Sequence, residues 1–309
     1  MAEGSDIMDS IPVILITGFL GAGKTTFLNS LLAYLRTRDK STALLINEFG
    51  RAGIDKDLVD SRGEAIYEVN QGSIFCVCTR DQFIRALDGI AGHSPSFDLA
   101  VIESTGIANT ADLRKHLDAP PLTGKIDIKQ NFCLIDAANF HKVFETLPAV
   151  RTQVGEASVC VINKTDLVDK NHLERLEARL RELNPDALIL QTSYGNIDFS
   201  AYLDLSGSWS ARAGLDTAPP EDIFSVTLVE PGFLSKEKVR RFLERHDRSL
   251  LRAKGFLATD QGRLFVEWVG GSLFTKPADT GVGSTGTLVL IGYGLSEASL
   301  KDEFKECLL

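Results

Sequence analysis

Residues 18–25 read GFLGAGKT and match the pattern G-x4-G-K-[ST]. An apolar run precedes the pattern, and apolar residues at helical spacing follow it. This order of strand, loop and helix is typical of a phosphate-binding loop. Glycines let successive backbone N–H groups turn around a phosphate, while Lys24 supplies charge to the β- and γ-phosphates and the Thr25 hydroxyl suits Mg²⁺. The predicted nucleotide-binding residues of this loop are Gly18, Gly21, Ala22, Gly23, Lys24, Thr25 and Thr26.

A second motif, N-K-T-D, begins at Asn163 directly after an apolar run. The Asp166 carboxylate can accept hydrogen bonds from N1–H and the exocyclic amine of guanine, whereas adenine would leave a desolvated carboxylate unpaired. We expect Asn163, Lys164 and Asp166 to bind the base, with Ser193 in a following T-S-Y-G segment closing over it. The two motifs together predict a guanine-nucleotide site.

Two acidic residues also follow apolar runs. Glu103 begins an E-S-T-G segment, and Glu48 lies in an N-E-F-G segment. A carboxylate at the tip of a strand beside the phosphate loop can hold Mg²⁺ or orient water, so Lys24, Glu48 and Glu103 form the predicted catalytic set. Gly106 is expected to bring its N–H close to the γ-phosphate. A solvated loop acid is the alternative for Glu48.

Strand-like and helix-like segments alternate in the first two thirds of the chain. Apolar runs occur at residues 12–17, 43–46, 99–102, 132–135, 159–162 and 187–190. Helical spacing is clearest at residues 25–36 and 171–183. Continuous apolar runs are typical of strands buried on both faces of a parallel sheet. The pattern predicts an α/β fold of the P-loop type, with a doubly wound, mostly parallel sheet.

The composition changes near residue 206. Residues 206–221 are rich in Ser, Gly, Ala and Pro and are expected to form a linker between a domain at 1–205 and a smaller α+β domain at 222–309. Strands are expected at residues 224–229, 255–258, 263–268 and 287–291, and helices at 236–245 and 297–308.

The 309-residue chain has 33 Lys and Arg against 42 Asp and Glu, a net charge of −9. An acidic chain is poorly suited to nucleic acid, and the N-terminal segment lacks the basic start and apolar core of a secretory signal. No apolar run reaches the roughly 18 residues of a membrane helix. The five cysteines are scattered, and Cys133 and Cys160 lie in apolar runs, which predicts buried thiols. We expect a cytoplasmic protein with no membrane or nucleic-acid partner.

The segments GFLGAGKTTFLN, NEFG, ESTGIAN, NKTD and LLRAKGF resemble the CobW family of P-loop GTPases, itself similar to the nickel-maturation GTPases UreG and HypB. The resemblance covers nearly the whole chain, and residues 222–309 resemble the CobW C-terminal domain. It implies Mg²⁺-dependent GTP hydrolysis that drives delivery of a metal, zinc or cobalt, or of a metal cofactor. The implied partners are GTP, GDP and a client metalloprotein or cofactor-dependent protein; a homodimer is left open.

The chain departs from the family in its cysteines. Where the family usually has G-C-x-C-C, residues 72–78 read GSIFCVC, so that Cys76 and Cys78 are the candidate transition-metal ligands. The two thiols would share one side if the segment is extended. They would suit Zn²⁺ or Co²⁺ but need further ligands. Arg51 follows NEFG, where the family often has Glu. A pair of ordinary cysteines is the alternative.

Two other functions stay open on this sequence. The first is a nucleotide-gated assembly factor for a client, for example a corrinoid protein, that carries no metal itself; the loss of two family cysteines favours it. The second is a small-molecule kinase or ATPase that uses the same phosphate loop. The N-K-T-D motif argues against the kinase, since it predicts guanine selection.

Overall fold

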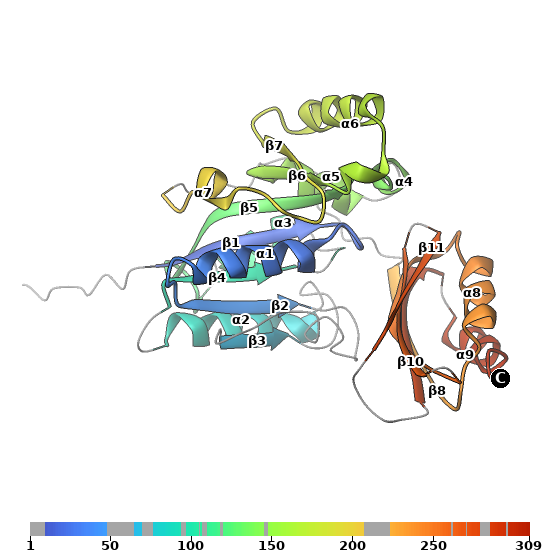
Figure 1. Ribbon diagram of the computed structural model, residues 1–309. Helices are drawn as coiled ribbons and strands as arrows, with labels where there is room; N and C mark the ends of the chain where they lie inside the picture. The colour runs from blue at the N-terminus through green and yellow to red at the C-terminus, as the bar shows by residue number, and fades with distance from the viewer. Residues whose placement is uncertain are drawn as a thin grey trace, which may run out of the picture. The chain divides into compact units, whose positions relative to one another are not determined.

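The structure is a computed structural model that describes residues 10–47, 65–69, 77–93, 97–104, 106, 110–117, 120–144, 148–206, 223–260, 262–269, 271–278, 285–294 and 296–309. The described residues up to 206 belong to one compact unit, and those from 223 onward belong to a second (Figure 1). Apart from Ser206, the linker expected at 206–221 lies outside the described residues. No described helix is both long and apolar enough to span a membrane.

The first unit is built on a seven-stranded parallel sheet in the order β3-β2-β4-β1-β5-β6-β7. Its strands are β1 Ile11–Gly18, β2 Thr42–Asn47, β3 Ala65–Val69, β4 Leu99–Glu103, β5 Ile126–Asp136, β6 Val159–Asn163 and β7 Leu188–Gln191. The helices are α1 Lys24–Arg36, α2 Val77–Ala91, α3 Thr110–Leu117, α4 Phe140–Phe144, α5 Pro148–Gly155, α6 Lys170–Leu183 and α7 Phe199–Tyr202, with a 3₁₀ turn at Thr165–Leu167. The predicted α/β class is confirmed.

Both faces of this sheet are covered, and this is why its strands are continuously apolar. Along β1, Ile14 and Ile16 belong to a core that includes Phe27 of α1. The intervening Val13 and Leu15 belong to a separate core. That second core contains side chains of α2 and α3, among them Phe83, Leu87 and Leu113. Because all strands are parallel, their carboxyl ends meet at one edge, where the loops after β1, β4, β5 and β6 come together.

The second unit is a five-stranded antiparallel sheet in the order β11-β10-β9-β12-β8. Its elements are β8 Ile223–Pro231, α8 Lys236–Arg245, β9 Leu250–Thr259, β10 Gly262–Val269, β11 Ser272–Pro277, β12 Thr285–Tyr293 and α9 Glu297–Lys305. The two helices share a core with one sheet face, in which Phe242 and Phe304 are fully buried. The helix predicted at 297–308 ends at Lys305, because Leu308 pairs with Leu234 as a β-bridge.

Strands β3 and β11 were not predicted from the sequence. Both lie at an edge of their sheet. β3 has five residues, and every position of β11 is either exposed or half-buried. A short or half-exposed edge strand lacks the continuous apolar run by which the central strands are recognised.

Candidate functional site

The phosphate loop joins β1 to α1, and two of its glycines are required by close approach. Gly18 has φ +126°, and a Cβ there would lie 2.2 Å from the carbonyl oxygen of Leu134. Gly23 has φ +99°, and its Cβ would lie 2.3 Å from Nδ2 of Asn163. A larger residue would therefore displace the loop from the neighbouring strand ends. Gly21 also has a positive φ, of 75°.

The first three residues of α1 are Lys24, Thr25 and Thr26. Lys24 is buried, and its Nζ donates to the carbonyl oxygens of Gly18 at 2.9 Å and Phe19 at 3.2 Å. The ammonium group is thus held against the loop that would receive a phosphate. Thr26 is exposed.

Thr25 and Glu103 are brought together by the pairing of β1 with β4. Ile16 pairs with Glu103 in the parallel register. The Thr25 hydroxyl donates to Oε1 of Glu103 at 3.2 Å, and the Glu103 side chain is buried. A hydroxyl and a carboxylate are the oxygen ligands that Mg²⁺ prefers, so this pair of residues fits the ion expected with a nucleotide.

Gly106 lies directly against the phosphate loop. A Cβ at this position would lie 2.5 Å from the backbone nitrogen of Leu20. Its carbonyl oxygen accepts from Nε2 of Gln153, a buried residue of α5, at 3.4 Å. Gly106 is therefore packed between the loop and α5.

Asn163 connects the two nucleotide motifs. Its Nδ2 donates to the carbonyl oxygen of Ala22 at 2.9 Å, and its Oδ1 accepts from the N–H of Gly195 at 3.0 Å. The Thr165 hydroxyl lies 3.0 Å from that of Ser193. Because Asn163 is buried and both ends of its amide contact backbone, it holds the phosphate loop and the T-S-Y-G segment in place.

Lys164 pairs with Asp136, which was not among the predicted site residues. Its Nζ lies 2.7 Å from Oδ2 of Asp136, the last residue of β5. Asp136 directly follows the apolar run at 132–135, as Glu103 follows the run at 99–102, and this position was its signal in the sequence. Asp166 lies in the 3₁₀ turn and is exposed, so that a ligand can reach its carboxylate.

Two predicted site residues, Glu48 and Cys76, lie outside the described residues. Cys78 lies in α2, whose backbone is helical from Val77. The condition of an extended backbone is therefore not met at Cys78, and the pairing of this residue with Cys76 stays a prediction. Within the described ranges, no three His, Cys, Asp or Glu side chains are grouped so that they could hold a metal ion.

The other three cysteines are buried, as predicted for Cys133 and Cys160. Burial raises the pKa of the Cys133 thiol to about 12 and that of Cys307 to about 11. Burial likewise raises the pKa of Cys160 well above its ordinary value. Since the thiolate is the reactive form, these three thiols are poor nucleophiles and poor metal ligands near neutral pH.

We therefore expect at most two fast-reacting thiols in the native protein at pH 8. A thiol with a pKa of about 12 is ionised to roughly one part in ten thousand at that pH, and burial also blocks the reagent. The measurement is the time course of reaction with a disulfide reagent on the parent and on Cys76→Ser/Cys78→Ser. The double variant should react only after denaturation, which should release three thiols. Fast reaction of the folded double variant would contradict the assignment.

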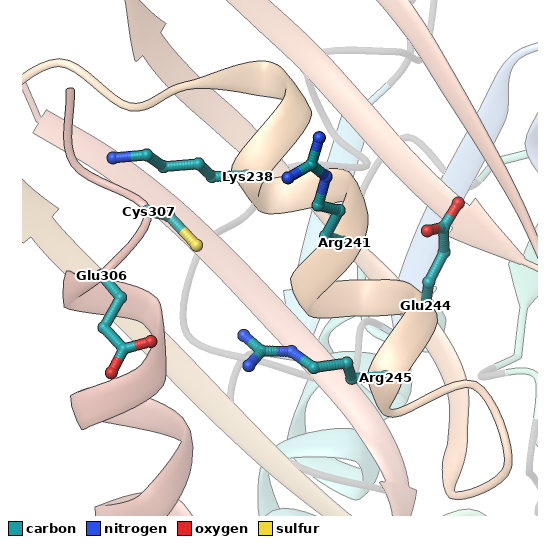
Figure 2. A pocket seen from close by; sticks show the side chains of 6 residues that line it. All are labelled: Lys238, Arg241, Glu244, Arg245, Glu306 and Cys307. Carbon is teal, nitrogen blue, oxygen red and sulfur yellow. The ribbon is translucent and has the colours of Figure 1, made fainter.

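The second unit contains a pocket of its own. Figure 2 shows it between α8 and the end of α9, lined by Lys238, Arg241, Glu244, Arg245, Glu306 and Cys307. Its charged groups have both signs, and several are engaged within the protein: Lys238 donates to the carbonyl oxygen of Leu308, and Arg245 lies 3.8 Å from Glu303. The loop between β1 and α1 remains the candidate nucleotide site.

A parallel sheet with a glycine-rich loop between its first strand and first helix defines a P-loop nucleoside triphosphatase fold. The nucleotide-binding domain of the CobW/HypB/UreG family matches residues 12–191, and the cobalamin synthesis protein cobW C-terminal domain matches residues 223–308. The chain belongs to the CobW/HypB/UreG family.

The names of two similar proteins refer to zinc. The chain is 28% identical to zinc-regulated GTPase metalloprotein activator 1 of Schizosaccharomyces pombe, over 86% of this chain and 76% of that protein. It is also 28% identical to the zinc chaperone YjiA of Escherichia coli, over 96% of this chain and 98% of that protein. Among solved structures, Zn(II)-bound YjiA GTPase from E. coli matches 97% of this chain and 99% of that one, with 22% identity and a TM-score of 0.46.

Proposed function

We propose that this chain is a Mg²⁺-dependent GTPase that delivers a metal, zinc in the first place, to a client metalloprotein. One observation supports the binding of GTP: Lys24, the Thr25–Glu103 pair and Asn163 all meet at the phosphate loop between β1 and α1. The metal part is supported by the names of the relatives, a zinc-regulated activator and a zinc chaperone.

In this proposal the phosphates of GTP take the place of the Gly18 and Phe19 carbonyls as partners of the Lys24 ammonium group. Thr25 and Glu103 hold Mg²⁺ directly or through water, and the ion neutralises charge on the β- and γ-phosphates. Asp166 receives the guanine edge, while Asn163 keeps the phosphate loop and the base loop at a constant separation. Glu103, or Glu48 beyond the described residues, orients the attacking water.

A second candidate is an assembly factor that binds its client without carrying metal. Two observations favour it: Ser73 and Phe75 stand where the family usually has cysteines, and Cys78 lies in the first turn of α2, which begins at Val77. Cobalt is the alternative cargo, since thiolates also suit that ion. The two functions differ in whether metal affinity depends on the nucleotide.

If Cys76 and Cys78 bind the cargo, Zn²⁺ affinity should differ between the GDP-bound and GTP-analogue-bound protein by about 5- to 150-fold. Reciprocity then requires Zn²⁺ to change the affinity for the GTP analogue, relative to GDP, by the same factor. Affinity should also weaken as pH falls, because thiolates must lose protons to bind. The measurement is a Zn²⁺ or Co²⁺ titration of the reduced protein in both nucleotide states.

The cysteine variants decide between the two candidates. Cys76→Ser and Cys78→Ser should each abolish the nucleotide-dependent part of metal binding, whereas Cys307→Ala, which removes a buried thiol of the second unit, should not. Metal binding by both serine variants that equals that of the parent would favour the client-binding function.

A further inference from the structure

We propose that Asp136 is a positioning residue for guanine selection: it holds the Lys164 ammonium group away from Asp166 and so keeps the Asp166 carboxylate available to the base. The inference rests on the proposed function, because it concerns how the same site recognises its nucleotide. It adds the tip of β5 to a recognition site otherwise built from the ends of β6 and β7.

The sheet places Asp136 beside the base-binding motif. Strands β5 and β6 are parallel neighbours, with Asp136 opposite Asn163 in the register. The N–H of Ala137 also donates to the carbonyl oxygen of Asn163 at 3.0 Å. The two strand ends are therefore joined at the residue before Lys164, so that the position of Asp136 relative to Lys164 is set by the sheet itself.

Both oxygens of Asp136 are engaged. Oδ1 accepts from the N–H groups of Ala138 and Asn139, at 3.0 and 3.2 Å. Oδ2 accepts from Nδ2 of Asn139 at 3.1 Å and from Nζ of Lys164 at 2.7 Å. The Asp136 side chain is only 8% exposed, so its charge is poorly solvated and depends on the lysine for neutralisation.

Lys164 is restrained at both ends. Its backbone has φ +62°, a left-handed conformation that is uncommon outside glycine, and its ammonium group is bound to Asp136. Asp166 is only two residues further on and is exposed. A lysine released from Asp136 would be within reach of that carboxylate through its four-carbon stem, and an ion pair there would compete with the N1–H and amine of guanine.

The test measures nucleobase discrimination as the ratio of the dissociation constants of IDP and GDP, since inosine lacks the exocyclic amine that Asp166 would bind. Asp136→Asn keeps an oxygen for the two turn N–H groups and removes the charge. We expect the ratio to fall about tenfold in this variant, because the released lysine occupies Asp166. Lys164→Met removes the competing cation, and its own ratio serves as the reference for the double variant.

The double variant Asp136→Asn/Lys164→Met separates positioning from a structural role. If Asp136 acts through Lys164, the double variant should have the ratio of Lys164→Met, because the Asp136 charge then has no lysine to hold. A ratio in the double variant well below that of Lys164→Met would assign Asp136 a structural role and overturn the inference, as would an unchanged ratio in folded Asp136→Asn. Should Asp136→Asn fail to fold, Asp136→Ser takes its place, because serine also accepts from turn N–H groups.

Asp88→Asn is the matched control. It removes another ion pair of the first unit, in which Oδ1 of Asp88 lies 2.7 Å from Nζ of Lys125, and it should leave the ratio unchanged. A parent protein that binds GDP no better than ADP would contradict the proposed function itself. That result is distinct from a guanine-selective parent whose selectivity does not respond to Asp136.

Discussion

Replacing Lys24 by alanine is expected to lower the rate of GTP hydrolysis by at least about a hundredfold, the usual cost of losing one charge-stabilising donor. The Lys24 ammonium group donates to the Gly18 and Phe19 carbonyls of the phosphate loop and is not part of the apolar core. Its removal therefore takes a cation from the loop without leaving a cavity in that core. The measurement is phosphate release at saturating GTP and Mg²⁺, together with a thermal denaturation curve that shows the variant to be folded.

Lys125→Ala is the control for the Lys24 variant. It removes a lysine of the same unit that is paired with Asp88, away from the phosphate loop, and hydrolysis should stay within about twofold of the parent. An unchanged rate in folded Lys24→Ala would show that hydrolysis occurs somewhere other than this loop.

Replacing Asp166 by asparagine is expected to weaken GTP binding by at least about a hundredfold and to improve binding of XTP. The amide presents an N–H donor where guanine also has donors, whereas the C2 carbonyl of xanthine accepts from it. Asp166 is exposed on a 3₁₀ turn, so the change should not cost stability. Competition of GTP, ATP and XTP against a fluorescent nucleotide measures all three affinities.

Asp169→Asn supplies the matched control for the Asp166 variant. Asp169 is exposed, lies three residues further on, and caps α6 by accepting from the N–H of His172 at 2.7 Å. Asparagine caps helices about as well as aspartate, so neither stability nor nucleotide preference should change. Equal affinity of the parent for GTP and ATP would contradict the predicted selection of guanine and would favour the small-molecule kinase or ATPase instead.

Local patterns in the sequence determined much of this protein's secondary structure. The helix predicted at 236–245 is α8, residue for residue, and that predicted at 25–36 differs from α1 by one residue. Helical period, buried apolar runs and glycine-rich turns depend on neighbours a few residues away, and these are visible in the sequence. The motif residues converge because carboxyl ends of parallel strands meet at one edge, which the α/β class already implied.

Only the tertiary structure decided which side chains contact one another there. Asn163 reaches Ala22 across 141 positions of the chain, and Lys164 reaches Asp136 across 28. The sequence presented Asn163 and Lys164 as base-binding residues, whereas the fold occupies both with protein partners and leaves Asp166 exposed. Such pairings follow from strand order and register, which are set by packing over the whole sheet and carry no local pattern.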